Sequence, residues 1–241
     1  MSEPLRVALV AEGPTDRIVI EAAIARMVSP CRIVLRQLQP EETLPFGRRG
    51  TGWGGVYHWC RDAVDRSGGS IRQDVLFENY DLLVLHLDAD VANSWYSQAG
   101  IDDSAKDLPF FQPCPPASAT TDRLRQVLLR WIDETSVPPR TVLCTPSKSA
   151  EAWVLAALFP ADPAVRKGNL ECWPDPEARL GQQPIRKRIR KSTRDYQNHA
   201  TDLEKAWPAL CGSLTEAARF RDEFQAAVLI HSVSARGSRE S

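Results

Sequence analysis

Short apolar runs alternate with segments of helical periodicity along the first two thirds of the chain, and this alternation constrains the fold more than any other feature. The third run, residues 81–87, is the most apolar, which is typical of a central parallel strand covered on both faces. The runs predict strands at residues 5–11, 32–38, 81–87 and 141–145. Apolar spacings of three and four residues predict helices over about 16–28, 53–65, 124–132 and 148–158, the first capped by Thr15. This pattern predicts an α/β domain with a mainly parallel four-stranded sheet, flanked by helices and connected by right-handed crossovers.

The alternation stops after Phe159. The chain continues with proline-rich loops, a basic run and two segments of helical character, at about 199–211 and 215–230. We therefore expect an α/β domain over residues 1–160 and a C-terminal helical extension over residues 161–241. A chain of 241 residues is long enough for one sizeable domain with such an appendage.

The composition excludes several classes of protein. Hydrophobic residues make up 43% and charged residues 25% of the chain, which excludes disordered, collagen-like and coiled-coil proteins. The 30 Lys and Arg residues against 31 Asp and Glu residues give a net charge of -1. This balance excludes a uniformly basic nucleic-acid binder but leaves room for a local basic patch.

The cysteines and the apolar segments indicate the cellular compartment in which the protein is expected. The six cysteines lie far apart without a CxxC pair, so zinc-finger spacing is absent and reduced thiols are expected. No apolar stretch approaches the roughly 20 residues that span a bilayer, and the first residues lack the pattern of a signal peptide. We expect a cytoplasmic protein without membrane association.

Acidic residues follow two of the predicted strands directly. Glu12 comes after the first strand, Asp88 and Asp90 come after the third, and Asp16 lies one helical turn beyond Glu12. If the two strands are neighbours, these carboxylates converge at the carboxyl edge of the sheet, where open α/β sheets bind ligands. Converging carboxylates favour a divalent cation, and an all-oxygen set favours one or two ions of Mg²⁺ or Mn²⁺ over zinc. The alternative is that they are turn residues, with Asp16 favouring its helix N-terminus electrostatically.

These motifs are similar to those of a known family. Glu12 to Asp16, followed by Asp88 and Asp90 after a later strand, resembles the TOPRIM domain of topoisomerases, primases and OLD-family nucleases. The segment 145–156 resembles the Glu-x-Trp helix of small stand-alone TOPRIM proteins, including the RloB-like group found in bacterial defence. The resemblance covers about residues 5–159 and implies a Rossmann-like TOPRIM catalytic domain within residues 1–160.

The resemblance also implies roles for individual residues. Glu12, Asp88 and Asp90 would be catalytic and ligate a metal ion, and Asp16 would contribute to a second ion. Glu151 would be a further catalytic acidic residue, although a glutamate in the first turn of a helix is equally explained by the helix dipole. Lys148 could stabilise the transition state of phosphoryl chemistry, unless it is a solvated lysine near a helix start.

A site of this kind fits phosphodiester hydrolysis, in which two metal ions activate water and stabilise the leaving oxygen. Primases and topoisomerases of this type need further zinc-binding, helicase-linked or tyrosine-bearing regions, for which the sequence offers no candidate. We therefore expect a nuclease, with DNA favoured over RNA. The resemblance implies a role in defence, with an ATPase partner or a second copy of the chain. The alternatives are a nucleotide-sugar glycosyltransferase that uses the Asp-x-Asp site and a non-catalytic TOPRIM module that binds nucleic acid or a partner.

A basic run in the extension is a candidate contact for the phosphate backbone. It holds six basic residues and no acidic one: Arg186, Lys187, Arg188, Arg190, Lys191 and Arg194. Arg48 and Arg49, in a glycine-rich loop, are a second candidate. The alternative for both is a solvated surface. His86, inside the third apolar run, is expected to be a hydrogen-bonded core histidine.

Overall fold

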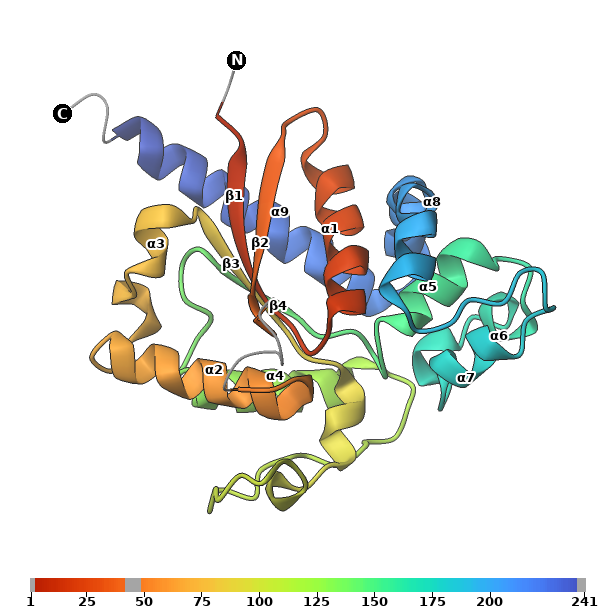
Figure 1. The fold of residues 1–241 in the computed structure, drawn as a ribbon, viewed down its shortest axis with the longest axis horizontal. Helices are drawn as coiled ribbons and strands as arrows, with labels where there is room; N and C mark the ends of the chain where they lie inside the picture. Colours follow the sequence, from red (N-terminus) through yellow and green to blue (C-terminus); the bar gives the residue numbers. More distant parts are fainter. Residues whose placement is uncertain (1–2, 42–48, 238–241) are drawn as a thin grey trace.

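A computed structural model describes residues 3–41 and 49–237, and in this part of the chain four parallel strands form one sheet (Figure 1). The strand order is β2-β1-β3-β4 and every neighbouring pair is parallel. The strands are β1 (Leu5–Val10), β2 (Ile33–Gln39), β3 (Leu82–His86) and β4 (Thr141–Cys144). The predicted α/β class and mainly parallel sheet are confirmed, and the sheet is parallel throughout.

Both faces of the sheet are covered, as the apolar character of β3 predicts. Alternate residues of a strand point to opposite faces, and the core divides accordingly into two clusters. Val7 and Leu9 of β1 belong to one cluster, whereas Ala8 and Val10 belong to the other. All four side chains are fully buried.

Helices from distant parts of the chain cover each face. The first cluster packs against α1 (Pro14–Val28), α5 (Glu151–Leu158), α8 (Thr193–Ser213) and α9 (Thr215–Gly237). The second packs against α2 (Gly52–Arg66) and α4 (Ser118–Trp131). Figure 1 shows α9 running beside the sheet, and contacts between α9 and β4 confirm that they pack together. The shorter helical segments are η1 (Ile71–Gln73), α3 (Leu76–Asn79), η2 (Ala89–Asn93), η3 (Tyr96–Ala99), α6 (Pro163–Arg166), η4 (Leu170–Cys172) and α7 (Pro176–Gly181).

The C-terminal helices share their core with the sheet. An aromatic cluster joins Trp153 of α5 to Trp207 of α8, with ring centroids 5.1 Å apart, and to Phe220 of α9 at 6.1 Å. The helix α8 begins at Thr193, earlier than predicted, because the Ser192 side chain accepts the backbone N–H of Asp195 and caps it. The end of the basic run is therefore helical.

The expectation of reduced cysteines is wrong for one pair. Cys114 and Cys172 form a disulfide, with their Cα atoms 5.5 Å apart. Their 58-residue separation gave no signal in the sequence, because only the fold brings the loop before α4 against η4. Cys31, Cys60, Cys144 and Cys211 are free thiols. Among the described residues, no helix has both the length and the apolar character needed to cross a bilayer.

Candidate metal centre

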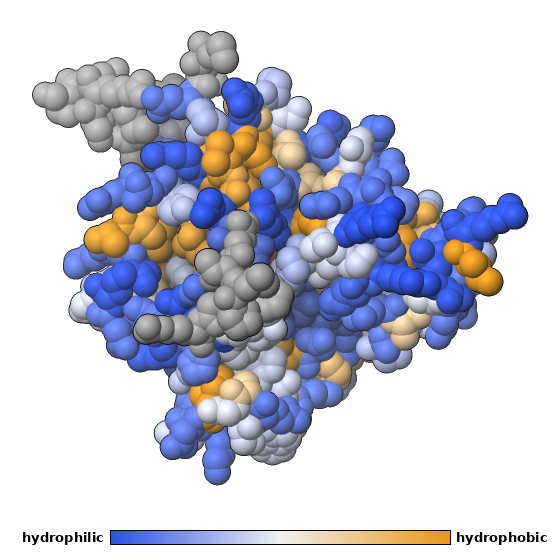
Figure 2. All heavy atoms as spheres, viewed as in Figure 1, coloured by the Kyte–Doolittle hydropathy of each residue, from blue (hydrophilic) through white to orange (hydrophobic). Residues whose placement is uncertain are grey.

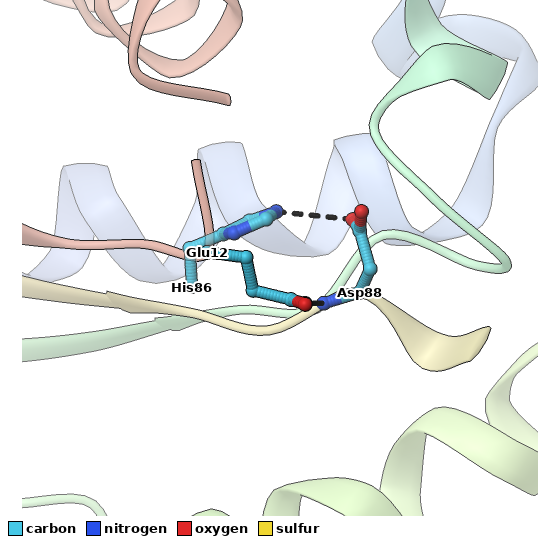
Figure 3. A group of neighbouring side chains, drawn as sticks. All are labelled: Glu12, His86 and Asp88. Carbon is cyan, nitrogen blue, oxygen red and sulfur yellow. Dashed lines mark hydrogen bonds and ion pairs between the residues drawn. The ribbon is translucent and has the colours of Figure 1, made fainter. Parts of the chain in front are cut away.

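Side chains from two neighbouring strands meet at the carboxyl edge of the sheet. Glu12 follows β1, His86 ends β3, and Asp88 lies two residues further on. Because β1 and β3 pair directly, all three residues reach the same place. Their potential ligand atoms, one from each residue, lie within 4.8 Å of one another (Figure 3). The structure thus brings Glu12 together with Asp88 and adds a histidine that the sequence analysis did not include.

Backbone hydrogen bonds hold this group in place. The N–H of Asp88 donates to Glu12 Oε1 at 2.8 Å (Figure 3), and Asp88 Oδ1 accepts the N–H of Ala150 at 2.9 Å. The N–H of Asp90 donates to the carbonyl of Lys148 at 2.9 Å. The loop that leads into α5 is therefore fastened to the residues that follow β3.

Negative charge outweighs positive charge in and around this group. Burial raises the pKa of Glu12 well above its ordinary value, and the nearby carboxylates of Asp88 and Asp90 raise it further. Burial also raises the pKa of Asp88 to about 7, although His86 opposes the shift. Carboxylates that resist ionisation at neutral pH are stabilised by a cation placed among them. The donor set therefore fits a divalent metal ion.

His86 lies in the core, as expected, but its surroundings are not those of an ordinary core histidine. It is fully buried, and its Nε2 lies 3.1 Å from Asp88 Oδ1. The contact lacks the direction of a hydrogen bond, and neither ring nitrogen has a hydrogen-bond partner in the described part of the chain. Burial alone would lower the pKa of His86, but the carboxylates of Asp88, Asp16 and Glu12 raise it to about 9. A signal was available in the sequence, because His86 and Asp88 are two residues apart and point the same way along an extended chain.

Asp16 and Asp90 lie beside the group of Glu12, His86 and Asp88 without belonging to it. Asp16 is buried, and its Oδ2 accepts the N–H of Gly13 at 2.8 Å. The helix α1 begins at Pro14 with Gly13 as its N-cap, so the prediction that Thr15 caps it is wrong. Asp16 lies in the first turn of α1, where its negative charge favours the helix N-terminus. This is the alternative role that the sequence indicates. Asp90 is exposed on η2.

Glu151 lies in a second polar network, next to the first. It is fully buried at the start of α5, where its Oε1 accepts the hydroxyl of Tyr196 at 2.9 Å and pairs with Lys191 Nζ at 3.2 Å. Burial alone would raise the pKa of Glu151, but the charge of Lys191 contributes most to holding it below its ordinary value. Lys191 also pairs with Glu177 at 3.1 Å. Glu151 is thus ionised, and its charge is neutralised by Lys191.

Lys148 is placed above an aromatic ring. Its Nζ lies 3.3 Å from the centroid of the Phe111 ring, a cation–π contact. Its backbone φ of +64° is left-handed, so α5 begins at Glu151 and not at Lys148 as predicted. Burial lowers the pKa of Lys148, and Asp90 opposes this shift.

The basic run has two parts in the structure. Lys191, although exposed, pairs with Glu151 and Glu177. The other five members are also exposed: Arg186, Lys187, Arg188, Arg190 and Arg194. Within the described residues, none of these five side chains forms an ion pair. Figure 2 shows the corresponding edge of the molecule as strongly hydrophilic, with an apolar protrusion. We name residues 186–194 the basic segment.

The second candidate phosphate contact is less available. Arg49 donates to Glu41 Oε1 and to Asp62 Oδ2, each at 2.6 Å. Its guanidinium is therefore engaged by two carboxylates. Arg48 lies outside the described residues.

Comparisons with protein-family models, with curated proteins and with solved structures find no match to the chain. The molecule is an α/β protein with a histidine–carboxylate group at the carboxyl edge of a parallel sheet. What it does must be inferred from that group and its surroundings.

Proposed function

We propose that the chain is a divalent-metal-dependent nuclease of the TOPRIM type that hydrolyses phosphodiester bonds, with DNA favoured over RNA. One observation carries the proposal: Glu12 and Asp88 meet at the ends of adjacent parallel strands, where burial and the neighbouring carboxylates raise the pKa of Glu12. In open parallel sheets this edge is where ligands bind. The RloB-like resemblance adds a role as a bacterial defence effector, with an ATPase or a second copy of the chain as partner.

In this proposal the carboxylates would bind the metal ions, and Lys148 would contact the substrate. Glu12 and Asp88 would hold a first Mg²⁺ or Mn²⁺, and Asp16 and Asp90, the carboxylates beside them, are available to a second. When bound, such ions polarise the phosphate, lower the pKa of water and stabilise the leaving oxygen. Lys148, beside Asp90, would donate to a phosphate oxygen after leaving the Phe111 ring.

The basic segment supports this assignment because of where it lies. Lys191 pairs with Glu151, and its charge also acts on Asp16 and Asp90. Through Lys191, the segment that carries the exposed arginines therefore reaches the acidic edge. A phosphate backbone bound to them would run close to the metal site.

The direct test is cleavage of plasmid, single-stranded DNA and RNA in Mg²⁺ or Mn²⁺. We expect Glu12→Gln and Asp88→Asn each to lower the rate at least about 100-fold, because losing even an outer-shell partner of a metal costs about 10–100-fold. Asp202→Asn, which removes an exposed carboxylate of α8, is the matched control and should leave the rate unchanged. Cleavage that survives both substitutions would show that this site is not responsible.

The same assay separates the competing functions. A protein that binds a nucleotide sugar with Mn²⁺ and cleaves no nucleic acid would be a glycosyltransferase. A protein that binds nucleic acid without cleaving it in either ion would be a non-catalytic module. Both outcomes would contradict the nuclease proposal.

A further inference from the structure

His86 is a fully buried imidazole whose Nε2 pairs with Asp88 Oδ1 but whose ring nitrogens form no hydrogen bond in the described part of the chain. Its side chain has no exposed surface. Burying a polar group without a hydrogen-bond partner is costly, so such groups are rare unless something else binds them. The ring nitrogens of His86 are therefore available to bind a ligand.

The surroundings of His86 indicate what that ligand is. Figure 3 shows the ring directed toward Asp88, and Nε2 lies 3.1 Å from Asp88 Oδ1. Two ligands about 2.1 Å from one ion and about 90° apart lie about 3.0 Å from each other, so this separation fits adjacent ligands of a single ion. Glu12 provides a third atom within 4.8 Å.

We propose that His86 Nε2 is a metal ligand together with Glu12 and Asp88, so that the site holds a first-row transition ion in preference to Mg²⁺. The inference deepens the proposed function and rests on its metal site. Mg²⁺ takes oxygen ligands and keeps several waters, whereas imidazole suits transition ions. Mn²⁺ suits carboxylates and lies lowest in the order of increasing affinity for N and O ligands, whereas Zn²⁺ suits imidazole and lies above it. We expect affinity to rise from Mg²⁺ to Mn²⁺ to Zn²⁺.

Pulsed electron paramagnetic resonance of the Mn²⁺-loaded full chain tests the ligand directly. We expect a ¹⁴N coupling to Mn²⁺ that changes to the ¹⁵N pattern when the protein is labelled with ¹⁵N-histidine. Bound Mn²⁺ without nitrogen coupling, or no Mn²⁺ binding, would overturn the inference. The experiment needs no substitution in the core, so it remains decisive if variants at position 86 do not fold.

Calorimetric titration tests the preference of the site for Mn²⁺ over Mg²⁺. In the unaltered protein Mn²⁺ should bind at least about tenfold more tightly than Mg²⁺, and His86→Asn should remove most of that difference. His58→Asn, at an exposed position on α2, is the matched control and should preserve it. Equal affinities for the two ions in the unaltered protein would contradict the inference.

These results are distinguishable from failure of the proposed function. A nitrogen-coupled Mn²⁺ in a protein that cleaves no nucleic acid would overturn the nuclease alone. Cleavage that depends on Glu12 and Asp88, with oxygen-only coordination, would overturn the role of His86 alone.

Discussion

Lys148 combines an unusual backbone conformation with a position beside the candidate metal centre. A non-glycine residue at φ +64° is disfavoured, and such residues cluster where geometry serves function. Here the carbonyl of Lys148 accepts the N–H of Asp90, which fastens the loop to the acidic edge. Its amine rests on the Phe111 ring and forms no ion pair with a carboxylate among the described residues. The side chain is thus held near the site and available to a phosphate.

Replacing Lys148 by Ala should lower the turnover number of the proposed nuclease by about 100-fold, the cost of removing one donor that stabilises transition-state charge. Mn²⁺ affinity should not change, because Nζ is not among the proposed ligands. Phe111→Leu is the control, since it removes the cation–π contact and keeps the amine. Steady-state cleavage kinetics and calorimetry measure both quantities. Unchanged turnover in Lys148→Ala would exclude a role in the reaction.

Secondary-structure elements were predictable where a local pattern decides them. The strands were located to within one or two residues because a buried parallel strand is a short apolar run whichever helices cover it. The meeting of Glu12 with Asp88 was conditional on β1 and β3 being neighbours, and the strand order is a property of the whole fold. The disulfide from Cys114 to Cys172 depends on packing between distant segments, so no local pattern revealed it. The two-residue spacing of His86 and Asp88 was a local signal, but the complete burial of His86 is a property of the whole fold.

The carboxylate of Asp162 links the short helices α6 and α7. Asp162 accepts the N–H of Ala164 at 2.9 Å and caps α6, and it accepts Gln183 Nε2 at 2.7 Å. Arg179 of α7 pairs with it at 3.1 Å. Burial alone would raise the pKa of Asp162, but these hydrogen bonds and the charge of Arg179 hold it below its ordinary value. Since the basic segment begins five residues after the end of α7, Asp162 also supports the candidate nucleic-acid contact.

The lowered pKa of Asp162 fixes the sign of a pH dependence. An aspartate whose pKa is lower in the folded state stabilises the fold above its unfolded pKa of about 3.9, and this contribution is lost as the pH falls through the folded pKa. At pH 7, Asp162→Asn should therefore reduce the free energy of unfolding by about 1–3 kcal/mol. The difference from the unaltered protein should shrink below about pH 4. Urea unfolding at pH 7 and pH 3 measures it, and a difference that stays constant would contradict this role.

At the scale of the whole molecule, the net charge of -1 conceals a separation of charge. The carboxylates gather at the carboxyl edge of the sheet, and the exposed arginines belong to a segment more than 90 residues away from Asp88 in the sequence. Lys191 connects the two regions through its ion pair with Glu151. The basic segment therefore lies where a polyanion would be drawn to the acidic edge despite its negative charge.

This arrangement predicts how binding depends on salt. The logarithm of nucleic-acid affinity falls with the logarithm of salt concentration by about 0.9 per phosphate neutralised on duplex DNA and about 0.7 on single strands. Neutralising Arg186, Lys187 and Arg188 to Gln should thus reduce the slope by about 2.7 on a duplex or about 2.1 on a single strand. These side chains have no described ion pair, so stability and Mn²⁺ affinity should be preserved.

The control for this variant removes the same charge elsewhere. Arg26, Arg32 and Arg36 are exposed on α1, just before β2 and on β2, away from the residues that follow β1 and β3. Changing them to Gln alters the net charge equally, so a long-range effect of total charge would lower affinity in both variants. If the basic segment contacts the phosphate backbone, the salt-dependence slope changes only in the variant of Arg186, Lys187 and Arg188. Equal slopes in the two variants, measured by fluorescence anisotropy from low to physiological salt, would show that the basic segment does not contact the backbone.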